Sequence, residues 1–342
     1  MVVNIFCKAS SNIGLGHLIR SYSFATQIVE SQKGISINYF LIGDVTLAKL
    51  ITNSKISLFC FEYEQAITGY IKNAEVSIID MIEIEETIIK AIKQYSSKIA
   101  LLSPVFNHLE LIDMYFGRTK YLNFNPSDYP SLKVFAGLEY AIIQKNCAPI
   151  NSGIYEENLK SQNFPIAISM GGGDAQNKTL EVLKALKKCK ANATFWVMVG
   201  EGYKHSFNDL IDEVRGDTSH EIILAKTNRS MWNVLKNCVL GILPGGLTSF
   251  EAAYAGLPTL NFFEQETQQF LLRELVENNA AHDFGIYSPQ TLDNIAAYID
   301  KVYVSKKELL QMHVSTKYLI DGNGTNRIYK TLIQSQYEYA FL

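Results

Sequence analysis

A glycine-rich turn near the N-terminus ends in a histidine, in the order Gly14-Leu15-Gly16-His17. Glycines let the backbone turn sharply and approach a ligand closely. An imidazole titrates near pH ~6.5 and so can accept or release a proton at neutral pH. The turn, within residues 11–20, follows an apolar run and precedes a helical pattern, whose unpaired N–H groups would point back toward the end of the strand. These residue types suit proton transfer beside a bound ligand.

A second stretch combines two glycines, a hydroxyl residue and an acid, in the order Pro244-Gly245-Gly246-Leu247-Thr248-Ser249-Phe250-Glu251. Free N–H groups at a helix start, the helix dipole and the Thr248 hydroxyl all favour a phosphate. The Glu251 carboxylate could accept hydrogen bonds from sugar hydroxyls. Alternatively, Thr248 is an ordinary N-cap and Glu251 its capping-box partner. This segment alone leaves both interpretations open.

A third stretch, Ser169-Met170-Gly171-Gly172-Gly173-Asp174, also places glycines directly after an apolar run. These glycines could admit a diphosphate, or they could form a plain turn in which Asp174 caps the next helix. The pattern is neither GxGxxG nor GxxxxGK[ST], so it does not indicate a dinucleotide or Walker site. The chain also lacks HExxH, a cluster of His and Cys ligands, and GxSxG. We therefore expect no metal and no organic cofactor.

Two further polar positions follow apolar runs and therefore belong to the ligand-binding edge of a sheet. Asp80 ends the run Val76 to Asp80, and Gln268 lies in the polar loop after the run Thr259 to Phe262. A solvated loop is the alternative interpretation for Gln268.

The elements that must position these residues repeat an α/β rhythm. In the first half, short β-rich runs are separated by helical patterns at about 18–31, 46–52 and 86–95. The runs are 3–6, 35–42, 56–61, 76–80, 99–102 and 120–124. Continuous apolar runs between helices are typical of parallel strands buried on both faces.

The rhythm breaks in a polar, proline-containing segment and then restarts. The second set of strands is predicted at 166–170, 194–199, 221–224, 239–243 and 259–262, and the helices at 179–189, 230–236, 248–255, 268–279, 289–302 and 324–337. We predict two doubly wound, Rossmann-like α/β domains whose glycine turns face one cleft. Their ranges are 1–145 for the N-terminal domain, 146–165 for a linker, 166–325 for the C-terminal domain and 326–342 for a terminal helix.

Composition agrees with a globular enzyme and excludes several other classes. The 342 residues are 47% hydrophobic and carry a net charge of −3, so nucleic acid is not an expected partner. No apolar run is long enough to span a bilayer, and no signal peptide is recognisable. Five scattered cysteines without CxxC spacing indicate free, buried thiols in a reducing compartment. We expect a cytoplasmic protein, and the sequence leaves its oligomeric state open.

The order of these motifs resembles the UDP-sugar hydrolases of pseudaminic acid biosynthesis and their relatives. The relatives are spore-coat polysaccharide proteins and, more distantly, the lipid-linked N-acetylglucosaminyltransferase of peptidoglycan synthesis. Besides IGLGH-LIR, ISMGGGD and GILPGGLTSFEAAYAGLPTL, two smaller matches are residues 135–143 (G-x-x-Y-x-x-L-like) and 321–327 (D-G-x-G-x-x-R). Together the matches extend in order from residue 13 to about 328.

The resemblance implies a GT-B architecture and assigns roles to individual residues. The N-terminal domain would hold the sugar, with His17 as catalytic base. Gly14, Gly16 and Asp80 would lie beside the sugar, and so would Gln268 of the C-terminal domain. The C-terminal domain would hold the nucleotide diphosphate through Gly171, Gly172, Gly245, Gly246, Thr248 and Glu251.

The chain departs from the hydrolase pattern at several positions. An Arg and an Asp usual on the first strand are replaced by Phe6 and Lys8. Ile82 replaces a Tyr, Thr267 replaces an Asn, and Leu247 replaces a Ser. The nucleotide half therefore matches the family better than the sugar half.

Three functions are compatible with these residues. The first is hydrolysis of a nucleotide sugar to UDP and a free amino- or deoxy-sugar, resembling the hydrolase of UDP-2,4-diacetamido-2,4,6-trideoxy-β-L-altropyranose, for surface-glycan biosynthesis. The second is a GT-B glycosyltransferase with a UDP-sugar donor. The third is a nucleotide-sugar-binding protein without catalysis.

Overall fold

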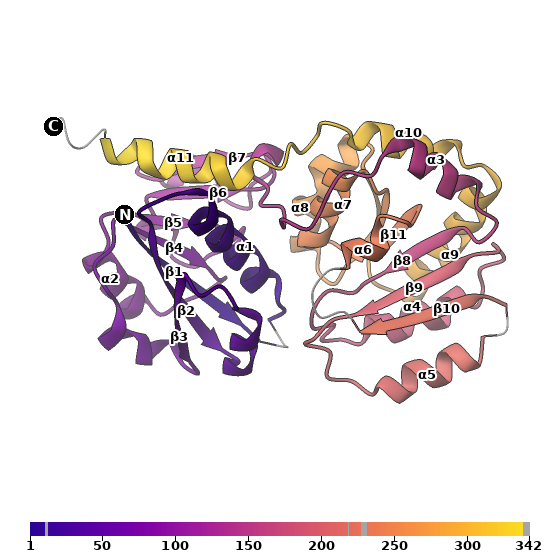
Figure 1. The fold of residues 1–342 in the computed structure, drawn as a ribbon, viewed down its shortest axis with the longest axis horizontal. Helices are drawn as coiled ribbons and strands as arrows, with labels where there is room; N and C mark the ends of the chain where they lie inside the picture. The colour runs from indigo at the N-terminus through magenta and orange to yellow at the C-terminus, as the bar shows by residue number, and fades with distance from the viewer. Residues whose placement is uncertain (11–12, 218, 227–230, 338–342) are drawn as a thin grey trace. The chain divides into compact units, whose positions relative to one another are not determined.

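The computed structural model describes residues 1–10, 13–217, 219–226 and 231–337, with every side chain in these ranges except those of 267 and 335–337. The chain forms two compact units (Figure 1). Unit 1 comprises Met1–Lys145 and Asp321–Leu342, and unit 2 comprises Asn146–Ile320. The chain therefore leaves unit 1 once and returns to it for its last helix.

Unit 1 is built on a seven-stranded parallel sheet in the order β3-β2-β1-β4-β5-β6-β7. The strands are β1 (Val2–Ala9), β2 (Ser36–Gly43), β3 (Ile56–Phe61), β4 (Val76–Asp80), β5 (Ile99–Leu101), β6 (Met114–Gly117) and β7 (Lys133–Ala136). The direction of winding reverses between β1 and β4, and in open α/β sheets ligands bind beyond the carboxyl ends of the strands at this switch point. In unit 1 those ends are Ala9 and Asp80.

Helices cover both faces of this sheet. On one face, α1 (Gly16–Ser31) buries Leu18, Phe24 and Ile28. On the other, α2 (Glu86–Gln94) buries an isoleucine stripe at 88, 89 and 92. Short 3₁₀ helices complete the connections: η1 (Val45–Leu50), η2 (Glu64–Tyr70), η3 (Leu109–Leu111), η4 (Pro126–Asp128) and η5 (Leu138–Tyr140). Burial of both sheet faces explains why the central strands are continuously apolar.

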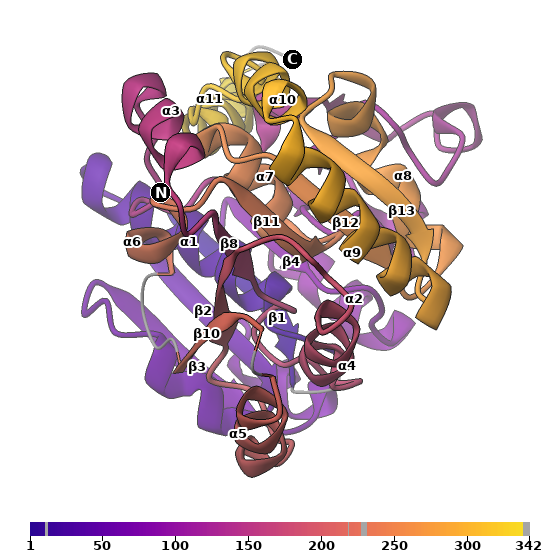
Figure 2. The ribbon, with the colours of Figure 1, turned by 90° about the vertical axis from the view of Figure 1, so that its right-hand side faces the viewer.

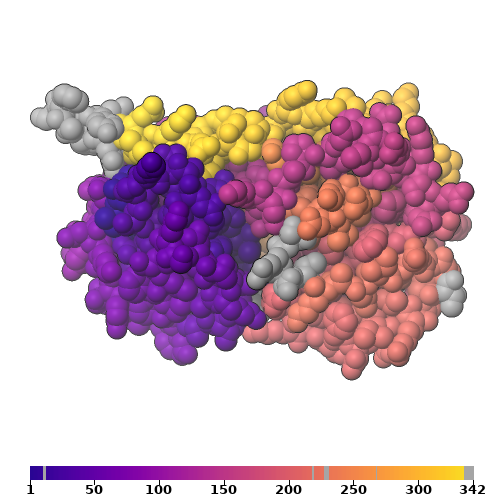
Figure 3. Space-filling view, in the orientation of Figure 1, coloured from indigo at the N-terminus to yellow at the C-terminus, as the bar shows by residue number. Residues whose placement is uncertain are grey.

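The last helix, α11 (Gly324–Tyr337), packs on unit 1. Its Ile328 and Leu332 join the apolar core that contains Leu18 and Phe24 of α1. In the space-filling view, α11 (yellow) covers one side of the indigo and purple unit (Figure 3). The terminal helix therefore completes the N-terminal core.

Two segments far apart in the sequence hold α11 in place. The Arg327 guanidinium donates to the Glu139 carbonyl at 2.5 Å and to both oxygens of the Asp321 carboxylate. A Cβ on Gly324 would overlap the Ala141 carbonyl oxygen, so the helix begins where only glycine fits. Residues 135–143 and 321–327, two of the sequence matches, thus contact each other.

Unit 2 is built on a six-stranded parallel sheet in the order β10-β9-β8-β11-β12-β13. Its strands are β8 (Pro165–Ile168), β9 (Thr194–Val199), β10 (Glu221–Lys226), β11 (Leu240–Pro244), β12 (Thr259–Phe263) and β13 (Ala281–Ile286). Its helices are α3 (Ser152–Lys160), α4 (Lys178–Leu186), α5 (Phe207–Arg215), α6 (Trp232–Leu235), α7 (Leu247–Ala255), α8 (Glu266–Glu277), α9 (Pro289–Val304) and α10 (Lys307–Thr316). Figure 2 shows α4 and α9 side by side on this unit. The switch point here lies between β8 and β11.

The prediction of two doubly wound α/β domains is confirmed, but several elements were predicted wrongly or missed. The strand expected at 120–124 is not one, and β6 and β7 instead lie at Met114–Gly117 and Lys133–Ala136. The segment expected at 46–52 as an α-helix is the 3₁₀ helix η1. Four-residue strands carry too few side chains to show a period in the sequence.

In unit 2 the sequence missed α5, α10 and β13. The strand β13 is at the sheet edge and reads AHDFGI, which is too polar to indicate a buried strand. Helix α5 carries apolar residues with helical spacing, but only Leu210 is buried. The helix expected at 230–236 is α6, and residue 230 lies outside the described residues.

The cysteines and helices carry two further findings. Four thiols are buried, but Cys60 is exposed, contrary to the expectation that all five are buried. Among the described helices, none has the length and apolar character needed to cross a bilayer.

Candidate functional site

The histidine turn begins where β1 ends. Gly14 adopts φ +90°, a left-handed conformation that favours glycine, and its N–H donates to the Ser10 carbonyl at 2.8 Å. Helix α1 starts two residues later, at Gly16, and no side chain caps it. Ser11 and Asn12, which open the predicted segment, lie outside the described residues. The turn therefore delivers His17 to the first turn of α1, at the carboxyl edge of the sheet.

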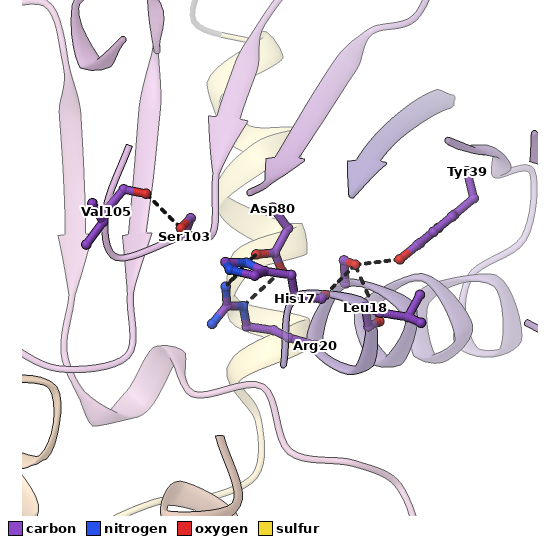
Figure 4. A network of polar contacts seen from close by, with 8 residues as sticks. His17, Leu18, Arg20, Tyr39, Asp80, Ser103 and Val105 are labelled. Atoms are coloured by element: carbon purple, nitrogen blue, oxygen red, sulfur yellow. Dashed lines mark hydrogen bonds and ion pairs between the residues drawn. The ribbon is translucent and has the colours of Figure 1, made fainter. Parts of the chain in front are cut away.

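His17 meets Asp80 and Arg20 at this edge (Figure 4). The distance from His17 Nδ1 to Asp80 Oδ1 is 2.7 Å, and Arg20 Nε donates to Asp80 Oδ2 at 2.9 Å. Arg20 Nη2 also donates to Asp80 Oδ1 and lies 3.3 Å from His17 Nδ1. The Asp80 side chain is fully buried, whereas the His17 side chain keeps 14% of its surface exposed. The structure thus brings the two predicted site residues into direct contact and adds a third, Arg20, to which the sequence assigned no role.

The ionisation of Asp80 fixes the roles in this cluster. Burial alone would raise the pKa of the Asp80 carboxyl, but Arg20 and His17 outweigh burial and hold that pKa below its usual value. An ionised carboxylate only accepts hydrogen bonds, so His17 Nδ1 carries the proton that it donates to Asp80. In a neutral imidazole that donates from Nδ1, Nε2 is the nitrogen with the free lone pair. This arrangement can accept a proton from water or from a hydroxyl group.

A buried chain of hydroxyl groups ties the start of α1 to the sheet. Burial raises the pKa of Tyr39 well above its usual value, so its phenol stays protonated. The Tyr39 hydroxyl lies 2.6 Å from Ser21 Oγ, which in turn donates to the His17 carbonyl at 2.7 Å. Neither residue was singled out from the sequence, because the link joins a helix to a neighbouring strand.

A second arginine approaches the cluster from β6. Burial is the main reason that the pKa of Arg118 falls to about 9, and the nearby Arg20 lowers it further, while Tyr115 and Asp80 oppose the shift. The side chains gathered at this edge are thus His17, Asp80 and two arginines.

The substituted first-strand residues lie on the opposite face of the sheet from Asp80. In register, Cys7 pairs with Asp80 and Phe6 pairs with Ile79. Phe6 is buried and stacks on Phe40 with ring centroids 4.6 Å apart. Lys8, on the same face as Phe6, pairs with Glu64 at 3.3 Å. These two departures therefore change the far face of the sheet.

Ile82, the third departure, follows Asp80 by two residues and is exposed, with 42% of its surface accessible. The hydrolase pattern that the sequence resembles has a tyrosine at this position, whereas the isoleucine side chain offers no hydrogen-bonding group.

In unit 2, the turn after β8 is held by close backbone contacts. Gly171 adopts φ +82°, and Gly202 N donates to the Gly172 carbonyl at 2.9 Å. A Cβ on Gly200 would lie 2.5 Å from the same oxygen. The Asp174 carboxylate accepts from the N–H groups of Lys178 and Thr179 at 2.7 and 2.9 Å. The alternative in which Asp174 caps the next helix is thus confirmed.

The turn after β11 leads into α7. A Cβ on Gly245 would overlap the Phe263 ring, whereas one on Gly246 would meet nothing within 4 Å. Gly246 is the N-cap of α7, and no side chain caps the helix. The alternative that made Thr248 the N-cap is therefore wrong: Thr248 is the second helical residue. At the start of α7, the Ser249 N–H donates to the Gly246 carbonyl at 3.2 Å, and the Gly246 N–H donates to the Pro244 carbonyl at 2.7 Å. The positive end of the helix dipole at this turn favours an anion.

Glu251 lies inside unit 2, below the first turn of α7. Its residue surface is 0% exposed, and the Trp232 indole N–H donates to Glu251 Oε2 at 3.3 Å. The sequence did not single out Trp232. Its ring comes from α6, which is distant in sequence.

Gln268 is in the first turn of α8, where its Oε1 accepts from the Glu264 N–H at 3.3 Å. The side chain of Thr267 lies outside what the structure describes. Since β8, β11 and β12 are adjacent and parallel, Gln268 and both glycine turns start from the same edge of one sheet.

Comparisons with known proteins agree with this architecture. No protein-family model matches the chain. It is 24% identical over 278 residues to the uncharacterized protein MJ1062 of Methanocaldococcus jannaschii, covering 79% of this chain and 57% of that protein. It is 21% identical over 207 residues to the spore coat polysaccharide biosynthesis protein SpsG of Bacillus subtilis, covering 60% of this chain and 59% of that protein. The chain thus spans less than two thirds of the length of either relative.

Solved structures show the fold. MurG of Acinetobacter baumannii superimposes with a TM-score of 0.68 at 14% identity, covering 97% of this chain and 99% of that one. UGT2 of Phytolacca americana, complexed with UDP-2fluoro-glucose and pterostilbene, gives 0.62 at 11% identity, covering 98% and 99%. Anabaena Alr3699/HepE in complex with UDP-glucose also gives 0.62 at 11% identity, covering 98% and 100%. The chain has the GT-B fold, with two Rossmann-like units.

Proposed function

We propose that this protein is an enzyme that acts on a nucleotide sugar, with UDP as the nucleotide and His17 as the general base. The observation that carries the proposal is the His17–Asp80 pair at the switch point of unit 1. It presents an imidazole Nε2 at the edge where α/β sheets bind ligands. The UDP-sugar complexes of structural neighbours support the choice of nucleotide.

The nucleotide diphosphate is assigned to unit 2. The amides of Gly171, Gly172 and Gly245, with the start of α7 and the Thr248 hydroxyl, are the donors that we propose for the phosphate oxygens, without a metal ion. The Gly246 N–H donates to the Pro244 carbonyl at 2.7 Å, so the proposed contribution of Gly246 is the space left by its missing side chain. Glu251 and Gln268 are proposed to recognise the ribose and the sugar. Full activity in the presence of EDTA is expected, and an absolute requirement for Mg²⁺ would contradict this assignment.

The reaction that we propose is hydrolysis, in which His17 takes a proton from the water that attacks the anomeric carbon. The products are UDP and a free amino- or deoxy-sugar, for use in surface-glycan synthesis, and the distant relation to SpsG supports that setting. A glycosyltransferase with the same donor site is the second candidate, because the superimposed MurG, UGT2 and HepE structures have the same fold. In that case His17 would deprotonate an acceptor hydroxyl.

Product analysis separates the two reactions. The protein is incubated with a panel of UDP-, CMP-, GDP- and dTDP-sugars without any acceptor, and the free nucleotide and free sugar are quantified. Equal amounts of UDP and free sugar, released at catalytic rates, are the result expected for the hydrolase. Release of nucleotide only after an acceptor is added would establish the transferase. Binding of UDP without turnover under either condition would show a binding protein.

The ribose role of Glu251 has its own test. Glu251→Gln keeps the size of the side chain but removes its charge, and we expect UDP to bind more weakly while turnover at saturating donor is preserved. Glu181→Gln, on the exposed side of α4, serves as control. A loss of turnover at saturating donor with unchanged UDP affinity would contradict the ribose assignment.

A further inference from the structure

We propose that Arg20 is a positioning residue that sets the proton affinity of His17. Its guanidinium shares the Asp80 carboxylate with the imidazole and places a positive charge beside the ring, which opposes protonation of Nε2. This inference rests on the proposed function only in taking His17 as the base.

The geometry places two groups, a guanidinium and an imidazole, on one carboxylate. Asp80 Oδ2 accepts from Arg20 Nε at 2.9 Å, and Asp80 Oδ1 accepts from both Arg20 Nη2 and His17 Nδ1. The guanidinium thus binds the carboxylate in a bidentate manner through two nitrogens, the strongest geometry for such a pair. The exposed fractions of the Arg20 and Asp80 side chains are 7% and 0%. The pair is therefore shielded from water, and its charges act strongly on the imidazole.

The contact between Arg20 and His17 is a contact between two donors. His17 Nδ1 donates to Asp80, and a guanidinium nitrogen can only donate, so the 3.3 Å approach of Nη2 to Nδ1 is not a hydrogen bond. It places a positive charge beside the ring. A carboxylate alone would favour the imidazolium, whereas the adjacent cation opposes it. Arg20 therefore offsets the effect of Asp80 on His17.

The other groups around the cluster do not replace Arg20 in this role. Arg118 lies within electrostatic reach of Arg20 and Asp80 and adds further positive charge. Burial raises the pKa of the Cys7 thiol to about 12 and that of Tyr39 well above its usual value. Both stay neutral at physiological pH, so Asp80 supplies the negative charge that acts on the imidazole and the two arginines supply the positive charge.

An NMR titration of the ligand-free protein tests the proposal without any substrate. The pH midpoint of the His17 ring signal is compared between the unmodified protein and Arg20→Gln. We expect the midpoint to rise by roughly one pH unit or more in Arg20→Gln, as is usual when a carboxylate acts unopposed. Arg20→Lys, which keeps a cation, should restore most of the original value. His108, bonded to Ile84 and Glu110, is the internal control and should not move. An unchanged His17 midpoint in Arg20→Gln would overturn the proposal.

A second measurement holds even if Arg20→Gln does not fold. The ¹⁵N shifts of the unmodified protein, read at a pH above the midpoint of the His17 titration, should show a protonated Nδ1 and an unprotonated Nε2 for His17. An Nε2–H tautomer would overturn the inference. A protein that shows the expected titration but no activity on any nucleotide sugar would refute the proposed function and leave the assignment of Arg20 standing.

Discussion

At the scale of single residues, the sequence predicted which side chains lie at the ligand-binding edge, but it did not predict which of them contact each other. His17 and Asp80 were each expected at the ligand edge, because a glycine turn precedes one and an apolar run the other. Their direct contact depends on β4 lying beside β1 although two other strands intervene in the chain. Arg20 lies on α1 with His17, but its role depends on Asp80 of β4, and Tyr39 reaches α1 from β2. A spatial neighbour contributed by another element leaves no local pattern in the sequence.

Tyr39→Phe tests the hydroxyl chain that holds the start of α1. The change removes one buried donor and leaves Ser21 Oγ without it, so we expect a loss of about 1–3 kcal/mol in the free energy of unfolding. Urea denaturation measures it. Tyr318→Phe, at a tyrosine that is 96% exposed, is the matched control and should be neutral. Equal stability of the two variants would show that the chain does not stabilise the turn.

Asp80 also predicts a pH dependence of stability. The pKa of the Asp80 carboxyl is lowered in the folded protein. The ionised carboxylate therefore adds to the free energy of unfolding above the unfolded-state pKa of ~3.9, and this contribution is lost as the pH falls through the pKa of the folded state. Asp80→Asn leaves a buried cation without its carboxylate and should cost about 3–5 kcal/mol at pH 7. Urea denaturation at pH 7, 5, 4 and 3 measures the difference in stability between the unmodified protein and Asp80→Asn. We expect this difference to shrink only below about pH 4. A gap that is the same at every pH would mean that the ionised carboxylate contributes nothing.

At the scale of elements, the glycine turns were predicted correctly as positions, and their physical reasons differ. Gly14 and Gly171 need a left-handed backbone, whereas Gly245 and Gly200 need space beside a ring or a carbonyl. Such packing cannot be deduced from a local motif, because the neighbour comes from another strand or turn. The start of α7 shows the limit: one of the two interpretations left open by the sequence made Thr248 the N-cap, whereas the N-cap is Gly246.

Adjacent glycines provide a matched pair of variants. Gly245→Ala must displace the buried Phe263 ring, so we expect a loss of about 1–3 kcal/mol in unfolding free energy. Gly246→Ala meets open space at φ −108° and should keep the stability of the unmodified protein. Thermal unfolding compares the two. A larger destabilisation by Gly246→Ala than by Gly245→Ala would contradict the packing at this turn.

The contacts that hold α11 on unit 1 can also be tested. Arg327→Ala removes the bonds to the Glu139 carbonyl and to Asp321, whose native pKa is held at about 2 chiefly by Arg327. Because this pair is partly exposed, we expect a modest loss of about 1 kcal/mol or less from the ion pair. In the Arg327→Ala protein, the amide hydrogen exchange of α11 should become faster, more than that of α1. Unchanged exchange of α11 amides would show that its apolar contacts suffice.

At the scale of the whole molecule, the sequence predicted the fold class correctly because two parallel sheets require long buried runs, and those runs are visible. It did not show that the last helix belongs to the first unit, since Ile328 and Leu332 enter a core assembled from distant residues. Of the strands that it missed, β13 lies at an edge of its sheet, and β6 and β7 are only four residues long. These elements do not hold the predicted site residues.

The central claim is that His17 is the base of a reaction on a nucleotide sugar. The most direct test is the turnover of His17→Ala at saturating donor, with the donor chosen from the acceptor-free panel and with His108→Ala as control. We predict that His17→Ala loses about 10²–10⁴-fold in kcat while UDP affinity is kept, and that His108→Ala retains full activity. Unchanged turnover in a folded His17→Ala protein would contradict the account.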